Sequence, residues 1–112
     1  MNRIVPKIWG REEWLIFNSK YVVKKLIIEP KQNISLQYHQ FKDEFWYVLE
    51  GSGTSYLEGE KMIIEAGDYL HIKPGNIHTV QASDEKLIIL ETSTSQVDDV
   101  VRISREVDWS CL

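Results

Sequence analysis

The chain has 112 residues, the length of one domain, and its 43% hydrophobic and 27% charged residues are typical of a folded protein. The formal net charge is -4 and the 13 basic residues form no run, which argues against a nucleic-acid partner. No apolar stretch approaches the roughly 20 residues that span a bilayer, and the first residues lack the apolar core of a signal peptide. The single cysteine, Cys111, excludes an internal disulfide. We therefore expect no membrane contact and a cytoplasmic location.

Short segments rich in β-branched and aromatic residues follow one another along the chain, separated by turn residues. The predicted strands cover residues 21–29, 45–50, 54–57, 62–65, 68–72, 79–81 and 87–91. A helical period of three and four residues holds at most in residues 10–17 and 97–103, for about two turns. So many short strands predict one all-β domain over residues 1–112, an antiparallel sandwich or barrel whose closure removes exposed edges.

A group of polar residues has the composition of a metal site. Gln37 and His39 are two residues apart, so on a strand they would share one face. The polar residues after His39 predict a turn, which would let Glu44 begin the next strand and face His39. His78 follows a Pro-Gly-Asn turn and opens another strand. Two imidazoles and a carboxylate are a common ligand set for a divalent metal, although a hydrogen-bonded core pair is the alternative for any one of them.

The spacing of these residues resembles the first of the two motifs of the cupin family. That motif has His-x-His, then four residues, a Glu, six residues and a Gly. Here Gln37-Tyr38-His39, Glu44 and Gly51 stand at the same spacing, with Gln37 in place of the first histidine. The resemblance implies a jelly-roll-like antiparallel β-barrel.

The second cupin motif also has a counterpart. In the family, a Gly precedes Pro-x-Gly, two residues and a His. Gly67, Gly75 and His78 fit, whereas Pro74 stands one place from the expected position, which Lys73 occupies. The match spans about residues 23–91. It implies one divalent ion, with zinc as the first expectation and manganese, nickel, cobalt or iron as alternatives. The implied ligands are Gln37, His39, Glu44 and His78.

A closer resemblance is to the cupin domain of type II phosphomannose isomerases, which is usually fused to a mannose-1-phosphate guanylyltransferase. Residues 7–10 resemble that family's opening Pro-Trp-Gly, and residues 23–26 resemble its Val-Lys-Arg-Ile strand. Residues 35–48 resemble its Ser-Leu-Gln-x-His … Glu-x-Trp-x-Val core, and residues 98–102 its Asp-Asp-Ile-Val-Arg tail. A glutamine at the position of Gln37 is expected in this family. The resemblance implies a mannose 6-phosphate/fructose 6-phosphate isomerase.

The sequence departs from this family in three respects. The family often carries Arg where this chain has Lys42. The family continues after its arginine with Asp-x-Tyr-Gly-Arg, and residues 103–109 do not match. The Gly-rich nucleotide loop of the guanylyltransferase is not found in these residues, so we do not expect nucleotide transfer from them.

Isomerisation of a sugar phosphate needs a metal that polarises the carbonyl, a group that moves a proton, and cations that hold the phosphate. Arg102 suits the last role because its planar fork pairs with phosphate oxygens. Lys24 is the next candidate, through its match to the family's strand lysine, and Lys42 could assist. A solvated surface charge is the alternative for each. We expect Asp98 and Asp99 to cap a short helix that presents Arg102, and no residue stands out as the base.

Three functions remain open from the sequence. The leading hypothesis is a metal-dependent sugar-phosphate isomerase. The second is a non-catalytic metal- or sugar-binding module, which the unmatched tail favours. The third is a small iron-dependent oxygenase, against which Gln37 argues because it would fill one of the open metal positions. Small cupins resembling this one usually pair, so we expect a homodimer, with residues 1–9 and 100–112 crossing between subunits.

Overall fold

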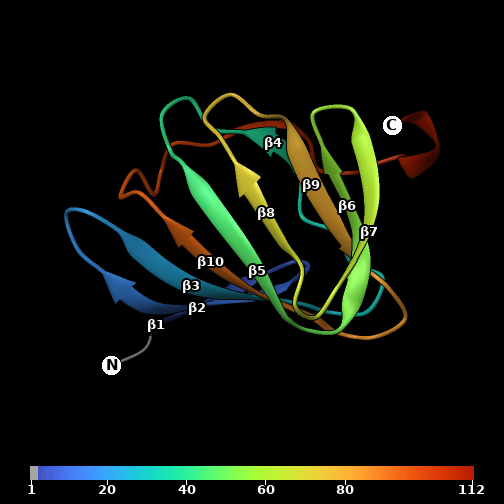
Figure 1. The fold of residues 1–112 in the computed structure, drawn as a ribbon, viewed down its shortest axis with the longest axis horizontal. Helices are drawn as coiled ribbons and strands as arrows, with labels where there is room; N and C mark the ends of the chain where they lie inside the picture. The colour runs from blue at the N-terminus through green and yellow to red at the C-terminus, as the bar shows by residue number, and fades with distance from the viewer. Residues whose placement is uncertain (1–2) are drawn as a thin grey trace.

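The computed structural model describes residues 3–112, and nearly all of its regular structure is β-strand (Figure 1). The strands are β1 (Arg3–Lys7), β2 (Gly10–Phe17), β3 (Val22–Ile28), β4 (Leu36–Tyr38), β5 (Glu44–Glu50), β6 (Ser52–Leu57), β7 (Glu60–Glu65), β8 (Tyr69–Ile72), β9 (His78–Ala82), β10 (Leu87–Ser93) and β11 (Val101–Ser104). A single 3₁₀ turn, η1 (Trp109–Cys111), follows β11. The predicted all-β class is confirmed. No helix in the described residues is long and apolar enough to cross a membrane.

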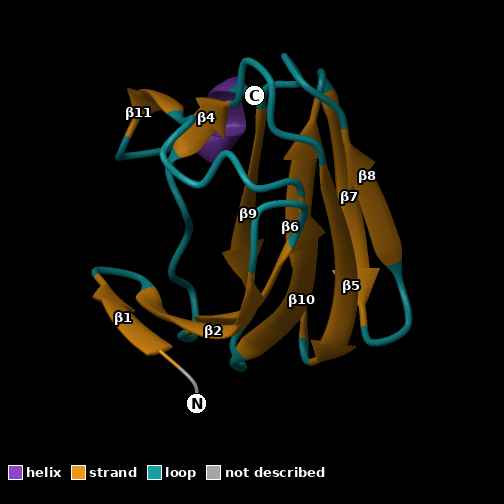
Figure 2. Ribbon diagram, turned by 90° about the vertical axis from the view of Figure 1, so that its left-hand side faces the viewer, coloured by secondary structure: helices purple, strands orange, loops and turns teal. Residues whose placement is uncertain are grey.

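Two antiparallel sheets face each other. The larger has the strand order β1-β2-β3-β10-β5-β8, and the smaller has the order β11-β4-β9-β6-β7. Strands distant in sequence are neighbours in both sheets, since β3 pairs with β10, and β4 with β9. In Figure 2 the β1–β2 end of the larger sheet and the β4–β11 end of the smaller sheet lie on the same side of the molecule.

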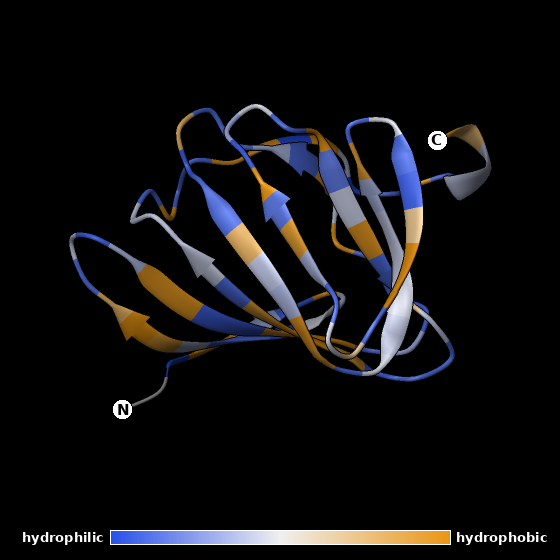
Figure 3. Cartoon of the chain, viewed as in Figure 1, coloured by the Kyte–Doolittle hydropathy of each residue, from blue (hydrophilic) through white to orange (hydrophobic). Residues whose placement is uncertain are grey.

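The core is apolar at one end of the barrel and becomes polar toward the other. Along β5 and β10 buried residues alternate with more exposed ones, and hydrophilic and hydrophobic residues interleave along the strands (Figure 3). Across β3, β10 and β5 the inward residues form three successive rows: Leu26 with Ile89 and Val48; Lys24 with Glu91 and Trp46; Val22 with Ser93 and Glu44. The first row belongs to the apolar core, whereas the next two introduce buried charges.

Two segments with weak helical periodicity are strands instead. Residues 10–17 form β2, which pairs with β1 on one side and β3 on the other. In residues 97–103 the chain forms no helix, and β11 pairs with β4 from Val101 onward. Hydrogen bonding to neighbouring strands therefore overrides a periodicity too short to nucleate a helix. The predicted strands at residues 21–91 correspond to β3 and β5 to β10.

Candidate metal centre

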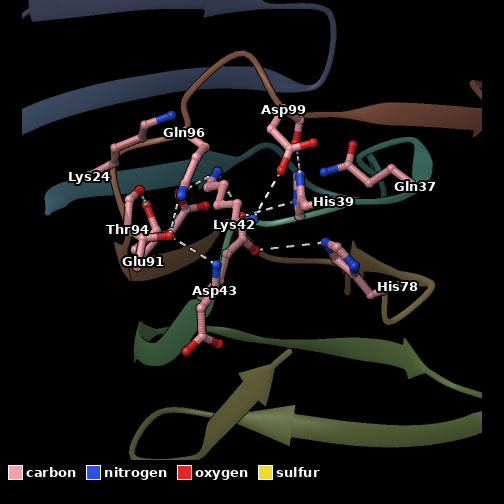
Figure 4. Close-up of polar contacts among 12 residues, drawn as sticks. Lys24, Gln37, His39, Lys42, Asp43, His78, Glu91, Thr94, Gln96 and Asp99 are labelled. Atoms are coloured by element: carbon pink, nitrogen blue, oxygen red, sulfur yellow. Dashed lines mark hydrogen bonds and ion pairs between the residues drawn. The ribbon is translucent and has the colours of Figure 1, made fainter. Parts of the chain in front are cut away.

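Three of the predicted metal ligands, His39, Glu44 and His78, lie close together. Figure 4 shows the side chains of His39 and His78 near each other. His39 directly follows β4, whereas Glu44 and His78 are the first residues of β5 and β9, as the sequence predicted. All three side chains are buried, and one ligand atom of each lies within 4.8 Å of the others. The Nε2 of His39 is 3.1 Å from Glu44 Oε1, and the Nε2 of His78 is 3.7 Å from Glu44 Oε2. One imidazole thus approaches each oxygen of the carboxylate.

The outer nitrogen of each imidazole is held by the backbone. His39 Nδ1 lies 2.5 Å from the Asp99 carbonyl oxygen, and His78 Nδ1 lies 2.9 Å from that of Asn76. A carbonyl oxygen only accepts, so both Nδ1 atoms carry a proton and donate it, and each Nε2 has a free lone pair when its ring is neutral. Among the described residues, these two Nε2 atoms and Glu44 Oε2 have no hydrogen-bond partner. A buried group of such atoms within 4.8 Å of one another fits a cation.

The charges around Glu44 favour its ionised form. Burial raises the pKa of Glu44, but His39, Lys42 and His78 outweigh burial and lower it to about 2. Burial lowers the pKa of His39, yet Glu44 outweighs that effect and the pKa is raised. For His78 burial dominates and its pKa is lowered. The carboxylate is therefore available as an anionic ligand.

Gln37 is placed beside this group, but its amide oxygen is engaged elsewhere. It is paired in register with His78 across β4 and β9, and Figure 4 shows its amide turned toward His39. Its Oε1 accepts a hydrogen bond of 2.7 Å from the Ser35 hydroxyl. Rotation of the amide would free the oxygen, because a hydroxyl can equally accept from the amide nitrogen. Gln37 as the fourth ligand remains a prediction.

Lys42 has a different position from the one expected for a phosphate anchor. Its side chain is buried, with Nζ 2.8 Å from Glu44 Oε1 and 3.3 Å from Glu91 Oε2. Burial lowers its pKa, but the charges of Glu91 and Glu44 outweigh burial and raise the pKa above its usual value. Glu91 was missed by the sequence analysis. The alternation Leu87, Ile89, Glu91 along β10 is the signal that could have placed this carboxylate on the inner face.

Asp99 organises the loop between β4 and β5 rather than capping a helix. Its carboxylate accepts backbone hydrogen bonds from Gln40, Phe41 and Lys42 at 3.1, 2.7 and 3.0 Å. Its carbonyl oxygen also accepts a hydrogen bond from His39 Nδ1. Asp99 therefore holds both the loop and a predicted metal ligand. The hydrogen bond from Phe41 is the largest cause that lowers the pKa of Asp99. The expected helix cap is wrong because residues 97–98 form a turn and β11 follows from Val101, so no helix begins at Asp98 or Asp99.

A cavity of about 890 Å³ opens beside the metal ligands and is lined by both predicted phosphate anchors. Arg102 is exposed on β11, where it is paired in register with Gln37. We find no ion pair for Arg102 within residues 3–112. Lys24 is instead buried, with Nζ 3.4 Å from Glu12 Oε1 and 4.2 Å from the centre of the Trp14 ring. The structure thus leaves Arg102 available to a ligand and gives Lys24 partners of its own.

Comparisons with known proteins agree with this architecture. A family model described as the cupin domain matches residues 25–93. Mannose-1-phosphate guanylyltransferase of Salmonella montevideo is 27% identical over 107 residues, which are 92% of this chain and 23% of that protein. The cupin-2 domain protein Rru_A2000 of Rhodospirillum rubrum superimposes with a TM-score of 0.83 at 16% identity, over 99% of this chain and 80% of that one. A candidate sugar phosphate isomerase of Acidithiobacillus ferrooxidans gives a TM-score of 0.60 at 25% identity, over 67% and 50% of the two chains.

The chain spans less than a quarter of the length of its curated guanylyltransferase relatives. The match over residues 25–93 runs from β3 to β10 and includes the three clustered side chains His39, Glu44 and His78. The resemblance seen in the sequence motifs is confirmed by this match and by the relatives. The chain belongs to the cupin domain family.

Proposed function

We propose that this chain is a metal-dependent aldose–ketose isomerase acting on a sugar phosphate of the mannose 6-phosphate/fructose 6-phosphate type. The observation that carries the proposal is the buried group of His39, Glu44 and His78, because His39 and Glu44 of this group line a cavity large enough for a small molecule. The names of the relatives support it, since one is named for a mannose phosphate and another as a candidate sugar phosphate isomerase.

In this proposal the site holds one divalent ion, with zinc as our first expectation. The ion would be bound by His39, Glu44 and His78, with Gln37 completing the set after rotation of its amide. When bound, it would supply a Lewis acid that polarises the substrate carbonyl. The chain contributes the orientation of the ligands, because the backbone at Asp99 and Asn76 fixes both imidazole rings.

The phosphate would lie at the mouth of the cavity, against Arg102. A guanidinium pairs with two phosphate oxygens at once, and Arg102 has the exposure that such a contact requires. Lys24 lines the same cavity, but a phosphate would compete with Glu12 for its ammonium group. We therefore assign the main anchor to Arg102 and a secondary part to Lys24.

The direct test is an isomerase assay of the full chain after its metal content has been brought to one ion per chain. Conversion between mannose 6-phosphate and fructose 6-phosphate, lost on metal removal and restored by metal, is the expected result. His71→Ala is a suitable control, because this exposed histidine pairs with Asp43 on the outside of the barrel. Fully loaded protein that converts no hexose phosphate would contradict the proposal.

A non-catalytic binding module is the second candidate. The specific observation in its favour is the chain after Arg102, which does not match the isomerase family and forms only the end of β11 and the short η1 turn. This alternative predicts that the loaded protein binds a sugar phosphate and releases it unchanged.

A further inference from the structure

A second buried carboxylate lies in the same cavity and has no part in the proposed metal site. Glu91 is on the inner face of β10, between Lys24 on β3 and Trp46 on β5 in the register of the sheet. Only 4% of its surface is exposed, and it lines the cavity. Lys42 Nζ approaches its Oε2 at 3.3 Å, yet this oxygen makes no hydrogen bond within the described chain. A buried carboxylate oxygen without a hydrogen bond is costly unless a ligand uses it.

The other carboxylates of the cavity are less suited to meet a substrate. Glu12 accepts the indole N–H of Trp14 at 2.9 Å and lies 3.4 Å from Lys24 Nζ. Asp98 is exposed at the cavity mouth. Glu44 faces both imidazoles and is assigned to the metal. Apart from Glu44, Glu91 is thus the cavity carboxylate in the described chain that is both buried and left with an oxygen that makes no hydrogen bond.

Lys42 links Glu91 to the carboxylate of the proposed metal site. Lys42 Nζ contacts Glu44 at 2.8 Å and Glu91 at 3.3 Å, so a single ammonium group separates the two carboxylates. A sugar whose carbonyl oxygen lies at the Glu44 end would present the adjacent carbon toward Glu91. A base must come within hydrogen-bond reach of the proton that it removes, and this arrangement allows it.

We propose that Glu91 is the catalytic carboxylate that moves the proton between C2 and C1 of the substrate. This inference rests on the proposed isomerase function. In the aldose-to-ketose direction, the C2–H bond breaks and its proton moves to a Glu91 oxygen. The electron pair left at C2 forms the C1–C2 double bond, and the π electrons of the C1 carbonyl move to its oxygen.

The second half of the step returns a proton, which Glu91 exchanges with solvent in a fraction of the turnovers. Glu91 gives it to C1, while the C2 hydroxyl transfers its own proton to the C1 oxygen and becomes the ketone. Protons and electrons balance without a further reactant. Burial, with the charge of Glu44, raises the pKa of Glu91, which favours its role as a proton acceptor. Lys42 positions the carboxylate and partly compensates its charge.

The test compares Glu91→Gln with wild type, both loaded with metal. The amide has the same shape but cannot accept the carbon-bound proton. We expect unchanged metal content by elemental analysis and sugar-phosphate affinity within about threefold by calorimetry. Turnover should fall by roughly 100-fold to 10,000-fold, the usual contribution of a positioned acid or base. In deuterated water, NMR should show label at C2 of recovered mannose 6-phosphate with wild type and none with the variant.

Two further variants make the outcome decisive. Glu13→Gln is the matched control, because Glu13 pairs with Arg11 on β2 and does not line the cavity. Glu91→Asp keeps the charge beside Lys42, so it should fold even if the amide variant does not, and should recover part of the turnover. Wild-type turnover and labelling in Glu91→Gln would overturn the inference and leave the isomerase standing. If Glu91→Gln loses metal or sugar binding as well as turnover, Glu91 has a structural role and the inference is wrong. Inactive wild-type protein would refute both.

Discussion

At the scale of single residues, the centre depends on a balance of buried charges. Glu44 and Glu91 would repel each other in a medium of low dielectric constant if Lys42 did not lie between them. Such an ion pair contributes little net stability when intact, because desolvation offsets the attraction. Removal of one partner is far more costly, because a charge is then left buried without compensation.

Lys42→Met should therefore destabilise the metal-free protein by about 3–5 kcal/mol, the usual cost of breaking a buried pair. Urea denaturation followed by tryptophan fluorescence measures this free energy. Lys31→Met is the control, since Lys31 forms an exposed pair with Asp84 and should cost less than about 1 kcal/mol. Equal effects of the two substitutions would show that Lys42 does not compensate the buried carboxylates.

Arg102 carries the prediction that separates the isomerase from a binding module. Arg102→Ala should preserve the fold and metal content, and should cost about 2–5 kcal/mol in the activation free energy of turnover, as for removal of one partner of a charge pair. Lysine should rescue it only partly, because it cannot form the bidentate contact. Arg11→Ala is the control, because Arg11 pairs with Glu13 on β2 and does not line the cavity. If the kinetics of Arg102→Ala equal those of wild type, Arg102 does not bind the substrate phosphate.

At the scale of strands and turns, two motif glycines differ in what the fold requires of them. Gly51 has φ +84°, and an added Cβ would lie 2.1 Å from the Lys86 carbonyl oxygen. Gly67 has φ +96°, but a Cβ there would meet nothing within 4 Å. Both positions need the left-handed backbone conformation. Only at Gly51 is there also no room for a side chain.

Gly67→Ala should cost about 1–2 kcal/mol for its backbone conformation alone. Gly51→Ala should cost clearly more, because the β5–β6 turn must also move away from Lys86. Chemical denaturation of the two variants in parallel gives the comparison. If the two free energies of unfolding fall equally, the close approach at Gly51 has no energetic consequence.

The local elements were more predictable than their long-range pairing. The turn before Glu44 and the Pro-Gly-Asn turn before His78 were visible in the sequence, and both strands begin where predicted. Strand β2 was not recognised, because its pairing with β1 and β3 depends on distant chain rather than on local periodicity. The burial of Lys42 was unexpected for the same reason, since one of its two partners, Glu91, is 49 positions further along the chain.

At the scale of the whole molecule, the two terminal regions pack onto their own chain. Strand β1 pairs with β2, and β11 with β4, so the described parts of the segments expected to cross between subunits make intramolecular contacts. Met1 and Asn2 lie outside the described residues. The predicted homodimer is therefore checked by light scattering over a range of protein concentrations, with twice the chain mass of 13.1 kDa as the expected value. A monomer mass at every concentration would refute it.

The proposed isomerase depends on the metal centre, and metal content tests that centre most directly. The full chain, purified without chelator, should contain about one divalent ion per chain by elemental analysis. His78→Ala should lose the ion, because one of the three converging ligands is removed, whereas His71→Ala, on the exposed side of β8, should retain it. Wild-type protein that contains no metal and takes up none when zinc, manganese, nickel, cobalt or iron is added would contradict the account.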